Sequence, residues 1–145
     1  SANNARKMPL TILKGVTDDM KAMKEEIFGP VLPVKTYAHI DEAIDYVNEH
    51  DRPLGLYYFG NDGAERKQVL ARTISGGVTV NDVVFHVSMD DLPFGGVGPS
   101  GMGSYHGVEG FREFSHARSV YTQPKIDVAK LGGLKPPYRS TDKKF

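Results

Sequence analysis

The chain has 145 residues, and its 18 lysines and arginines balance 18 aspartates and glutamates, so the formal net charge at pH 7 is zero. This balance, without a dense basic run, argues against a nucleic-acid partner or an anionic membrane surface. No apolar stretch approaches the roughly 20 residues that span a bilayer, and no signal-peptide pattern follows the polar N-terminus. We therefore expect a soluble, cytoplasmic protein, and 39% hydrophobic residues predict one compact domain with a substantial core.

The N-terminal region predicts little regular structure. Residues 1–7 are small and polar, which is typical of a frayed or cut end. Residues 10–13 form an apolar run that predicts a short strand. Residues 31–34 predict an edge or bulged strand, because Pro30 and Pro33 cannot donate to a ladder of backbone hydrogen bonds.

The middle of the chain alternates helical and strand patterns. A helix is predicted at about residues 40–49 from the i, i+3, i+4, i+7 spacing of Ile40, Ala43, Ile44 and Val47. Pro53 prevents its continuation, and the apolar run 54–59 predicts a buried strand.

A second helix and strand follow at once. Asp62 and Glu65 resemble a capping box, which predicts a helix over about residues 63–74 that Gly76-Gly77 ends. Residues 78–80 predict a strand that ends at Asn81. Two successive helix-then-strand units joined by short loops predict an α/β fold with a partial parallel sheet.

The regular pattern stops after Asn81. Residues 82–104 read as a long loop that ends in a glycine-rich run, and loops of this length in compact domains are usually functional. A third helix is predicted at about 104–115 and a closing strand at 119–123. The domain is therefore placed at residues 8–123, and residues 124–145 are expected to form an irregular tail that packs loosely or is disordered.

The chemistry of the chain is limited by its lack of cysteine. Disulfides, thiolate metal ligands and cysteine nucleophiles are thereby excluded within it. The five histidines show no spacing typical of metal ligands, so no metal site is expected. Ser100 lacks the surroundings of a nucleophilic serine, and we assign no catalytic residue.

The first candidate site is the segment from Glu25 to Pro30. A carboxylate two residues before an aromatic ring, followed by a Gly-Pro turn, can present hydrogen-bond acceptors and an apolar surface to one ligand. A vicinal diol donates two hydrogen bonds to one carboxylate, so a ribose is a natural partner. The alternative is a solvated glutamate beside a phenylalanine of the core.

The second candidate site is the long loop with its glycine-rich run, residues 94–103. The run lacks the strand and helix context of a dinucleotide fingerprint, so its glycines more plausibly shape a wall by close backbone approach. Asn81 and His86 are the polar candidates here, and Phe94 is an apolar one. The alternative for His86 is an exposed or hydrogen-bonded side chain with no chemical role.

Four motifs in order resemble the C-terminal part of the aldehyde dehydrogenase superfamily, over about residues 8–123. The loop after Asn81 and the ending of the last motif look most like the class 3 and coniferyl aldehyde dehydrogenase branch. The motifs are Glu25-Glu26-Ile27-Phe28-Gly29-Pro30-Val31, Pro53-Leu54-Gly55-Leu56, Gly76-Gly77-Val78-Thr79-Val80-Asn81-Asp82, and Leu92-Pro93-Phe94-Gly95-Gly96-Val97-Gly98-Pro99-Ser100-Gly101-Met102-Gly103-Ser104-Tyr105-His106-Gly107.

The resemblance implies roles for six residues. Glu26 would hold the nicotinamide ribose of NAD or NADP, and Phe28 and Leu56 would lie near the nicotinamide. His86 and Phe94 would line or border the aldehyde tunnel, and Asn81 would support the active-site loop.

The resemblance also implies a mechanism that this chain cannot complete. A cysteine thiolate attacks the aldehyde, hydride passes to NAD(P)+, and a glutamate activates the water that hydrolyses the thioester. With no cysteine, the chain is expected to be an inactive C-terminal piece of a longer dehydrogenase, which would be a homodimer paired through strands near the chain end. The alternative is a non-catalytic association module that uses residues 119–123 as an edge.

Overall fold

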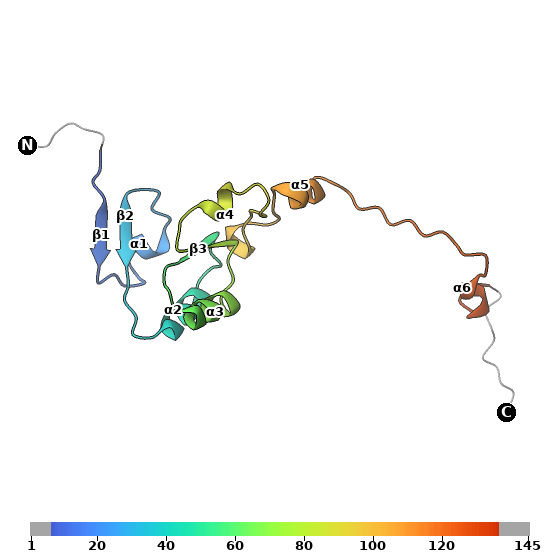
Figure 1. The fold of residues 1–145 in the computed structure, drawn as a ribbon, viewed down its shortest axis with the longest axis horizontal. Helices are drawn as coiled ribbons and strands as arrows, with labels where there is room; N and C mark the ends of the chain where they lie inside the picture. Colours follow the sequence, from blue (N-terminus) through green and yellow to red (C-terminus); the bar gives the residue numbers. More distant parts are fainter. Residues whose placement is uncertain (1–6, 137–145) are drawn as a thin grey trace, which may run out of the picture.

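A computed structural model describes residues 7–136 of the chain, and Figure 1 shows its fold. Apart from Lys7, the predicted frayed end lies outside the described residues, as do residues 137–145 of the predicted tail. Within 7–136, no helix has both the length and the apolar character needed to cross a membrane.

The first part of the fold is a small parallel sheet. Strands β1 (Thr11–Lys14) and β2 (Val31–Val34) pair from Thr11 opposite Val31 to Lys14 opposite Val34. The predicted strand 10–13 is confirmed with a shift of one residue, and 31–34 is confirmed as a strand of a two-stranded sheet. The connection contains α1 (Lys21–Lys24), which the sequence analysis missed because four residues are too few to show a helical period.

The second part is a β–α–β unit preceded by a helix. Its elements in chain order are α2 (Ile40–Glu49), β3 (Gly55–Tyr58), α3 (Gly63–Arg72) and β4 (Gly77–Val80). The two strands are parallel, with Gly55 opposite Gly77 and Tyr58 opposite Val80. The predicted α/β class with a partial parallel sheet is confirmed, although the strands form two separate pairs.

The core lies between this sheet and the two helices. Ile44, Tyr58 and Val69 are buried there, and Ile40, Leu56 and Val80 pack against them. The helices are further joined by Arg72, which pairs with Asp41 and lies 3.7 Å from Asp45. Burial, together with a 2.8 Å hydrogen bond donated to Glu65, raises the pKa of Tyr58 to about 12. The prediction of a buried strand at 54–59 is wrong for Leu54, Tyr57 and Phe59, which are exposed, because on the Tyr57 side of the sheet only the four-residue α4 packs against β4.

The surface of the chain is much larger than a compact domain would have. Its solvent-accessible area is 12537 Å². A compact monomer of 15.9 kDa would expose about 7,400 Å². The expectation of one compact domain with a substantial core is therefore wrong, because few of the apolar side chains find cover within the described residues.

The segment after β4 is irregular, with short helical turns. These are α4 (Phe85–Ser88), the 3₁₀ turn η1 (Gly98–Ser100), α5 (Gly107–Glu113) and α6 (Val128–Leu131). The predicted third helix is confirmed in shortened form as α5. An antiparallel bridge joins Phe94 to Tyr105 across the glycine-rich run.

The predicted closing strand at 119–123 is wrong. Figure 1 shows the chain after α5 running away from the rest of the fold as an extended arm that ends in α6. Val120 and Tyr121 are 77% and 80% exposed, and no strand of the described residues lies beside them to supply a ladder. The arm is extended without being part of a sheet.

The start of α3 offers a test of the local sequence rules. Asp62 caps this helix by accepting hydrogen bonds from the backbone N–H groups of Ala64 (2.8 Å) and Glu65 (3.1 Å). We expect Asp62→Ala to lower the free energy of unfolding by about 1 kcal/mol, measured by urea denaturation. Asp51→Ala, at an exposed position outside the helices, is the control. Equal stability of the two variants would contradict the capping role.

Candidate functional site

Glu26 and Phe28 lie on the loop between α1 and β2. Glu25 forms an ion pair with Lys21 at 3.8 Å, whereas the structure gives the Glu26 carboxylate no hydrogen-bond partner among residues 7–136. Phe28 is 92% exposed, so it is not a core residue of the described part of the chain. Its backbone has a φ of +44°, a left-handed conformation that costs energy for a residue with a side chain. The loop thus presents a free carboxylate and a free aromatic ring to solvent.

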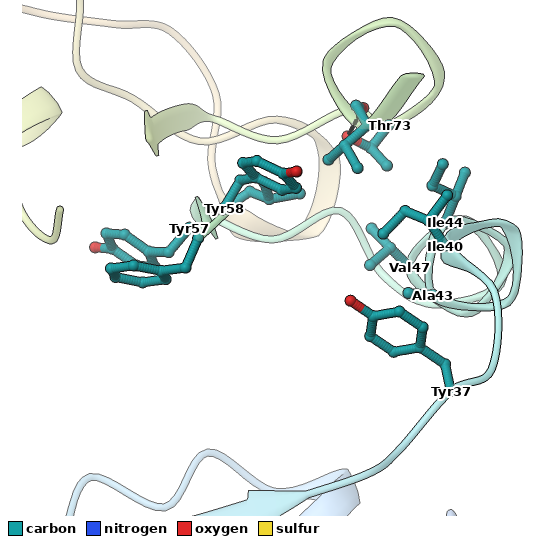
Figure 2. A pocket seen from close by; sticks show the side chains of 11 residues that line it. Tyr37, Ile40, Ala43, Ile44, Val47, Tyr57, Tyr58 and Thr73 are labelled. Carbon is teal, nitrogen blue, oxygen red and sulfur yellow. Dashed lines mark hydrogen bonds between the residues drawn. The ribbon is translucent and has the colours of Figure 1, made fainter. Parts of the chain in front are cut away.

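Leu56 lies on the face of the β3–β4 sheet that α2 and α3 cover. It lines an apolar cavity of about 220 Å³ together with side chains of α2, β3 and α3. Figure 2 shows the α2 side chains Ile40, Ile44 and Val47 on one side of this cavity and Tyr58 facing them. Leu56 therefore belongs to the rim of the small core.

His86 is buried on the opposite face of the same sheet. A hydrogen bond of 2.6 Å joins its Nδ1 to the Thr79 hydroxyl, and its backbone N–H donates to the same hydroxyl at 3.3 Å. The ring lies over the paired glycines: a Cβ on Gly77 would sit 2.4 Å from the His86 ring. Its Nε2 is buried without a hydrogen-bond partner in the described structure. His86 is therefore a hydrogen-bonded side chain at Nδ1, as one of the alternatives predicted, whereas its Nε2 has no partner among the described residues.

An aromatic cluster extends from His86 into the glycine-rich run. The ring of Phe94 lies 6.4 Å from that of His86 and 5.7 Å from that of Tyr105, and the ring of His106 lies 6.1 Å from Phe94. Tyr57, on the same face of β3, lies 5.7 Å from His86. Together with α4, the cluster covers part of this face of the sheet with aromatic rings.

Asn81 follows β4 and holds the end of β3. Its side-chain amide accepts from the Gly60 N–H at 2.8 Å and donates to the Gly60 carbonyl at 3.0 Å. Asn81 itself has a φ of +56°, which asparagine tolerates better than most residues. Both functional groups of this side chain are therefore used within the protein.

The six predicted site residues do not form one group in the described structure. His86 and Phe94 lie together, while Leu56 is on the other face of the sheet and Glu26 and Phe28 are on the loop of the first sheet. Their assignments to the cofactor and the substrate remain predictions. Thr79, the partner of His86, was missed, because its role depends on the strand register and on the turn at Val84.

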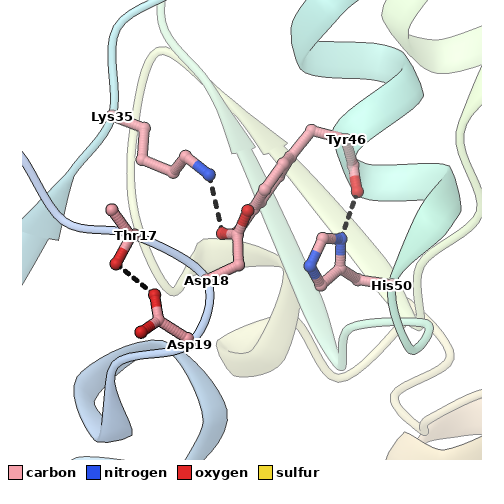
Figure 3. Close-up of polar contacts among 6 residues, drawn as sticks. All are labelled: Thr17, Asp18, Asp19, Lys35, Tyr46 and His50. Carbon is pink, nitrogen blue, oxygen red and sulfur yellow. Dashed lines mark hydrogen bonds and ion pairs between the residues drawn. The ribbon is translucent and has the colours of Figure 1, made fainter.

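A polar group at the carboxyl ends of β1 and β2 was also missed. The Lys35 ammonium donates to Asp18 Oδ1 at 2.6 Å, as Figure 3 shows, and the Tyr46 hydroxyl donates to the same oxygen at 2.9 Å. The ammonium also lies 4.3 Å from the centre of the Tyr46 ring. The hydrogen bonds from Lys35 and then Tyr46 hold the pKa of Asp18 below its ordinary value. The Asp18 partner in turn raises the pKa of Lys35.

The described residues contain no group of three or more histidine, cysteine, aspartate or glutamate side chains that could hold a metal ion. Residues 7–136 present the Glu26 carboxylate with the exposed Phe28 ring, and the aromatic cluster around Phe94.

Comparison with known protein families gives a match over most of the chain. The model of the family described as "Aldehyde dehydrogenase family" matches residues 2–120. A probable coniferyl aldehyde dehydrogenase of Caulobacter vibrioides is 61% identical over 145 residues, which are 100% of this chain and 30% of that protein. A coniferyl aldehyde dehydrogenase of Pseudomonas sp. strain HR199 is 56% identical over 92% of this chain and 27% of its own length.

A canine relative carries the name "Aldehyde dehydrogenase, dimeric NADP-preferring" and is 47% identical over 88% of this chain and 28% of its own length. The chain thus spans about 30% of the length of these curated relatives.

Solved structures agree with this match. The substrate-bound state of Staphylococcus aureus AldH is 42% identical, with a TM-score of 0.76, over 83% of this chain and 27% of that one. A mutant of AldC from Pseudomonas syringae, in complex with NAD+ and octanal, is 36% identical, with a TM-score of 0.64, over 72% of this chain and 21% of that one.

The buried contact between Thr79 and His86 predicts a stability effect. Thr79→Val keeps the shape of the side chain but leaves both ring nitrogens of a buried histidine without a partner. We expect a loss of about 1–3 kcal/mol in the free energy of unfolding, measured by urea denaturation. Thr36→Val, at an exposed threonine, is the control. The same small change in both variants would rule out the buried hydrogen bond.

The lowered pKa of Asp18 predicts a pH effect of known sign. A carboxylate whose pKa is depressed in the folded state stabilises it above the ordinary value of 3.8, and this contribution disappears as the pH falls through the lowered value. Titration of the Asp18 carboxyl carbon by NMR should give a midpoint below 3.8. Lys35→Ala should raise that midpoint more than Tyr46→Phe, because Lys35 is the larger cause. A midpoint of 3.8 or higher in the unmodified chain would contradict this account.

Proposed function

Because the chain belongs to the aldehyde dehydrogenase family, we propose that it forms the C-terminal part of a longer, nicotinamide-dependent enzyme that oxidises an aldehyde to a carboxylic acid. The structural observation that carries the proposal is the loop with Glu26 and Phe28. An aromatic ring that is 92% exposed, in a strained backbone conformation, next to a carboxylate without a partner in the described residues, is suited to a ligand.

The two side chains of the loop fit a nicotinamide nucleotide by their chemistry. An ionised carboxylate accepts hydrogen bonds from both hydroxyls of a ribose, and such charge-assisted bonds are stronger than neutral ones. The exposed ring of Phe28 can pack on a flat heterocycle. A bound nicotinamide cofactor would supply the hydride acceptor for oxidation of the aldehyde. The NAD+ in the AldC complex supports NAD, and the name of the canine relative supports NADP, so the proposal covers both.

The nucleophile that forms the covalent bond to the aldehyde must come from a part of the enzyme outside this chain. Covalent aldehyde oxidation in this family proceeds through a thiolate, and the chain has no cysteine. The large uncovered apolar surface supports the same view, because apolar side chains of this number are normally packed against further protein. The 145-residue chain by itself is thus proposed to have no dehydrogenase activity.

The substrate is proposed to be an aromatic aldehyde. The names of the Caulobacter and Pseudomonas relatives support coniferyl aldehyde or a similar compound. The aromatic surfaces of Phe94 and its neighbours on the open face of the sheet would suit a ring-containing substrate.

We also propose that the complete protein is a homodimer, to which the arm contributes. The exposed, extended residues 119–123 and the word "dimeric" in the name of the canine relative support this role. An association module without catalysis is the second candidate function, and the same arm favours it.

The role of Glu26 predicts a change in cofactor binding. In the longer dehydrogenase, Glu26→Gln removes the charge that strengthens the bonds to the ribose. We expect the dissociation constant of NAD+ or NADP+ to rise about tenfold, equal to about 1.4 kcal/mol, measured by calorimetry. Glu25→Gln is the matched control, because Glu25 already pairs with Lys21 and differs in sequence by one position. Equal affinities for both variants and the unmodified protein would overturn the assignment of Glu26.

A further inference from the structure

The loop with Glu26 and Phe28 belongs to a part of the fold that has few ties to the rest. The strand unit, residues 7–36, contains β1, α1 and β2, and the helical unit, residues 40–80, contains α2, β3, α3 and β4. Among the described residues, one side-chain hydrogen bond crosses between these two units: the one that Tyr46 of α2 donates to Asp18. The position of the loop relative to the second sheet therefore depends on a small number of contacts.

Asp18 and Lys35 meet at the carboxyl ends of the two parallel strands, whereas the loop with Glu26 and Phe28 precedes the amino end of β2. Asp18 precedes α1, and Lys35 directly follows the last residue of β2. Their contact of 2.6 Å joins residues 17 positions apart in sequence and ties the end of β2 to the segment that follows β1. Tyr46 then ties this pair to α2 through its hydroxyl, 2.9 Å from Asp18, and through its ring beneath the Lys35 ammonium.

We propose that Asp18 is a positioning residue, which, through Lys35 and Tyr46, fixes the strand unit that carries the cofactor loop against α2 and so sets where Glu26 and Phe28 meet the nucleotide. This inference rests on the proposed function of the loop. Asp18 does not touch the cofactor in this account: it acts on the backbone that carries the two contact residues. Figure 3 shows the three side chains converging from three different segments of the chain.

The contacts of Asp18 are suited to orientation more than to stability. The Asp18 and Lys35 side chains are 54% and 35% exposed, and ion pairs at such positions add little to the free energy of unfolding. A loop whose position is set by so few contacts can nevertheless change its orientation when one of them is lost. Loss of Asp18 should therefore change the loop position without unfolding the protein.

The neighbouring Asp19 supplies a matched control. Its carboxylate accepts a hydrogen bond from the Thr17 hydroxyl, so that contact stays within one turn of the chain. It makes no hydrogen bond or ion pair with the helical unit among the described residues. Asp19→Ala removes the same charge one position away and leaves the bridge to α2 in place.

The first test measures the loop position directly. Because the chain has no cysteine, Lys24→Cys at the end of α1 and Lys67→Cys on α3 give unique sites for two spin labels. Double electron–electron resonance should give one narrow distance peak in the full chain, kept in Asp19→Ala and lost as a single peak in Asp18→Ala and Tyr46→Phe. A narrow peak in Asp18→Ala, or a broad distribution before Asp18 is changed, overturns the proposal. Circular dichroism of each variant shows that it is folded.

The second test measures the consequence for the cofactor in the longer dehydrogenase. Asp18→Ala should raise the KM for NAD(P)+ and leave kcat at saturating cofactor unchanged, and Asp18→Asn, which keeps an oxygen acceptor for Tyr46, should recover part of the loss. Asp19→Ala should leave KM unchanged. A KM for Asp18→Ala equal to that of the unmodified enzyme overturns the positioning role. Unchanged cofactor affinity in Glu26→Gln instead overturns the proposed function of the loop, so the two failures are distinguishable.

Discussion

Two parallel strands have two faces to cover, and this chain covers one face of the β3–β4 pair with α2 and α3. That packing buries Ile44, Tyr58 and Val69 and forms the small core. On the other face, Gly55 and Gly77 lie opposite each other and have no side chains, so the His86 ring can pack directly against the backbone of the sheet. The register that places these two glycines side by side thus leaves room for the His86 ring, where the aromatic cluster begins. Apolar side chains outside these contacts remain exposed to solvent, in line with the large accessible area of the chain.

The first sheet stands apart from this arrangement, and the proposed cofactor contacts lie on it. The carboxyl ends of its two strands are tied together by Asp18 and Lys35 and are joined to α2 by Tyr46. The buried contacts of the second sheet contribute stability, whereas the exposed contacts of Asp18 define a position. Stability and site geometry therefore depend on different residues, and a substitution at either place should affect one property more than the other.

The sequence predicts those elements whose patterns are local and long enough to read. The spacing of Ile40, Ala43, Ile44 and Val47 is sufficient for α2, and Asp62 marks the start of α3. The four-residue helices α1 and α4 are too short to show a period, and they were not foreseen. Residues 119–123 have the composition of a strand, but a strand requires a neighbour, and none is present among the described residues.

The candidate site divides in the same way. Glu26 and Phe28 could be found from residue type and from the Gly-Pro that follows them, but their exposure could not, since it depends on what the rest of the fold leaves uncovered. The contact of Thr79 with His86 and the bridge from Asp18 to Tyr46 join residues through tertiary structure, so no spacing in the sequence predicts them. Membership of the aldehyde dehydrogenase family suggests which ligands these residues bind, and their exposure and hydrogen bonds indicate which side chains are accessible to a ligand.

The α1–β2 loop, with Glu26 and Phe28, is the proposed contact of this chain with a nicotinamide nucleotide. Hydrogen–deuterium exchange of the longer dehydrogenase, measured with and without NAD+, tests it most directly. The account predicts slower exchange of the backbone amides of residues 26–29 when the cofactor is present, with no change in α3. Unchanged exchange in residues 26–29 under conditions where NAD+ slows exchange elsewhere in the enzyme would contradict it.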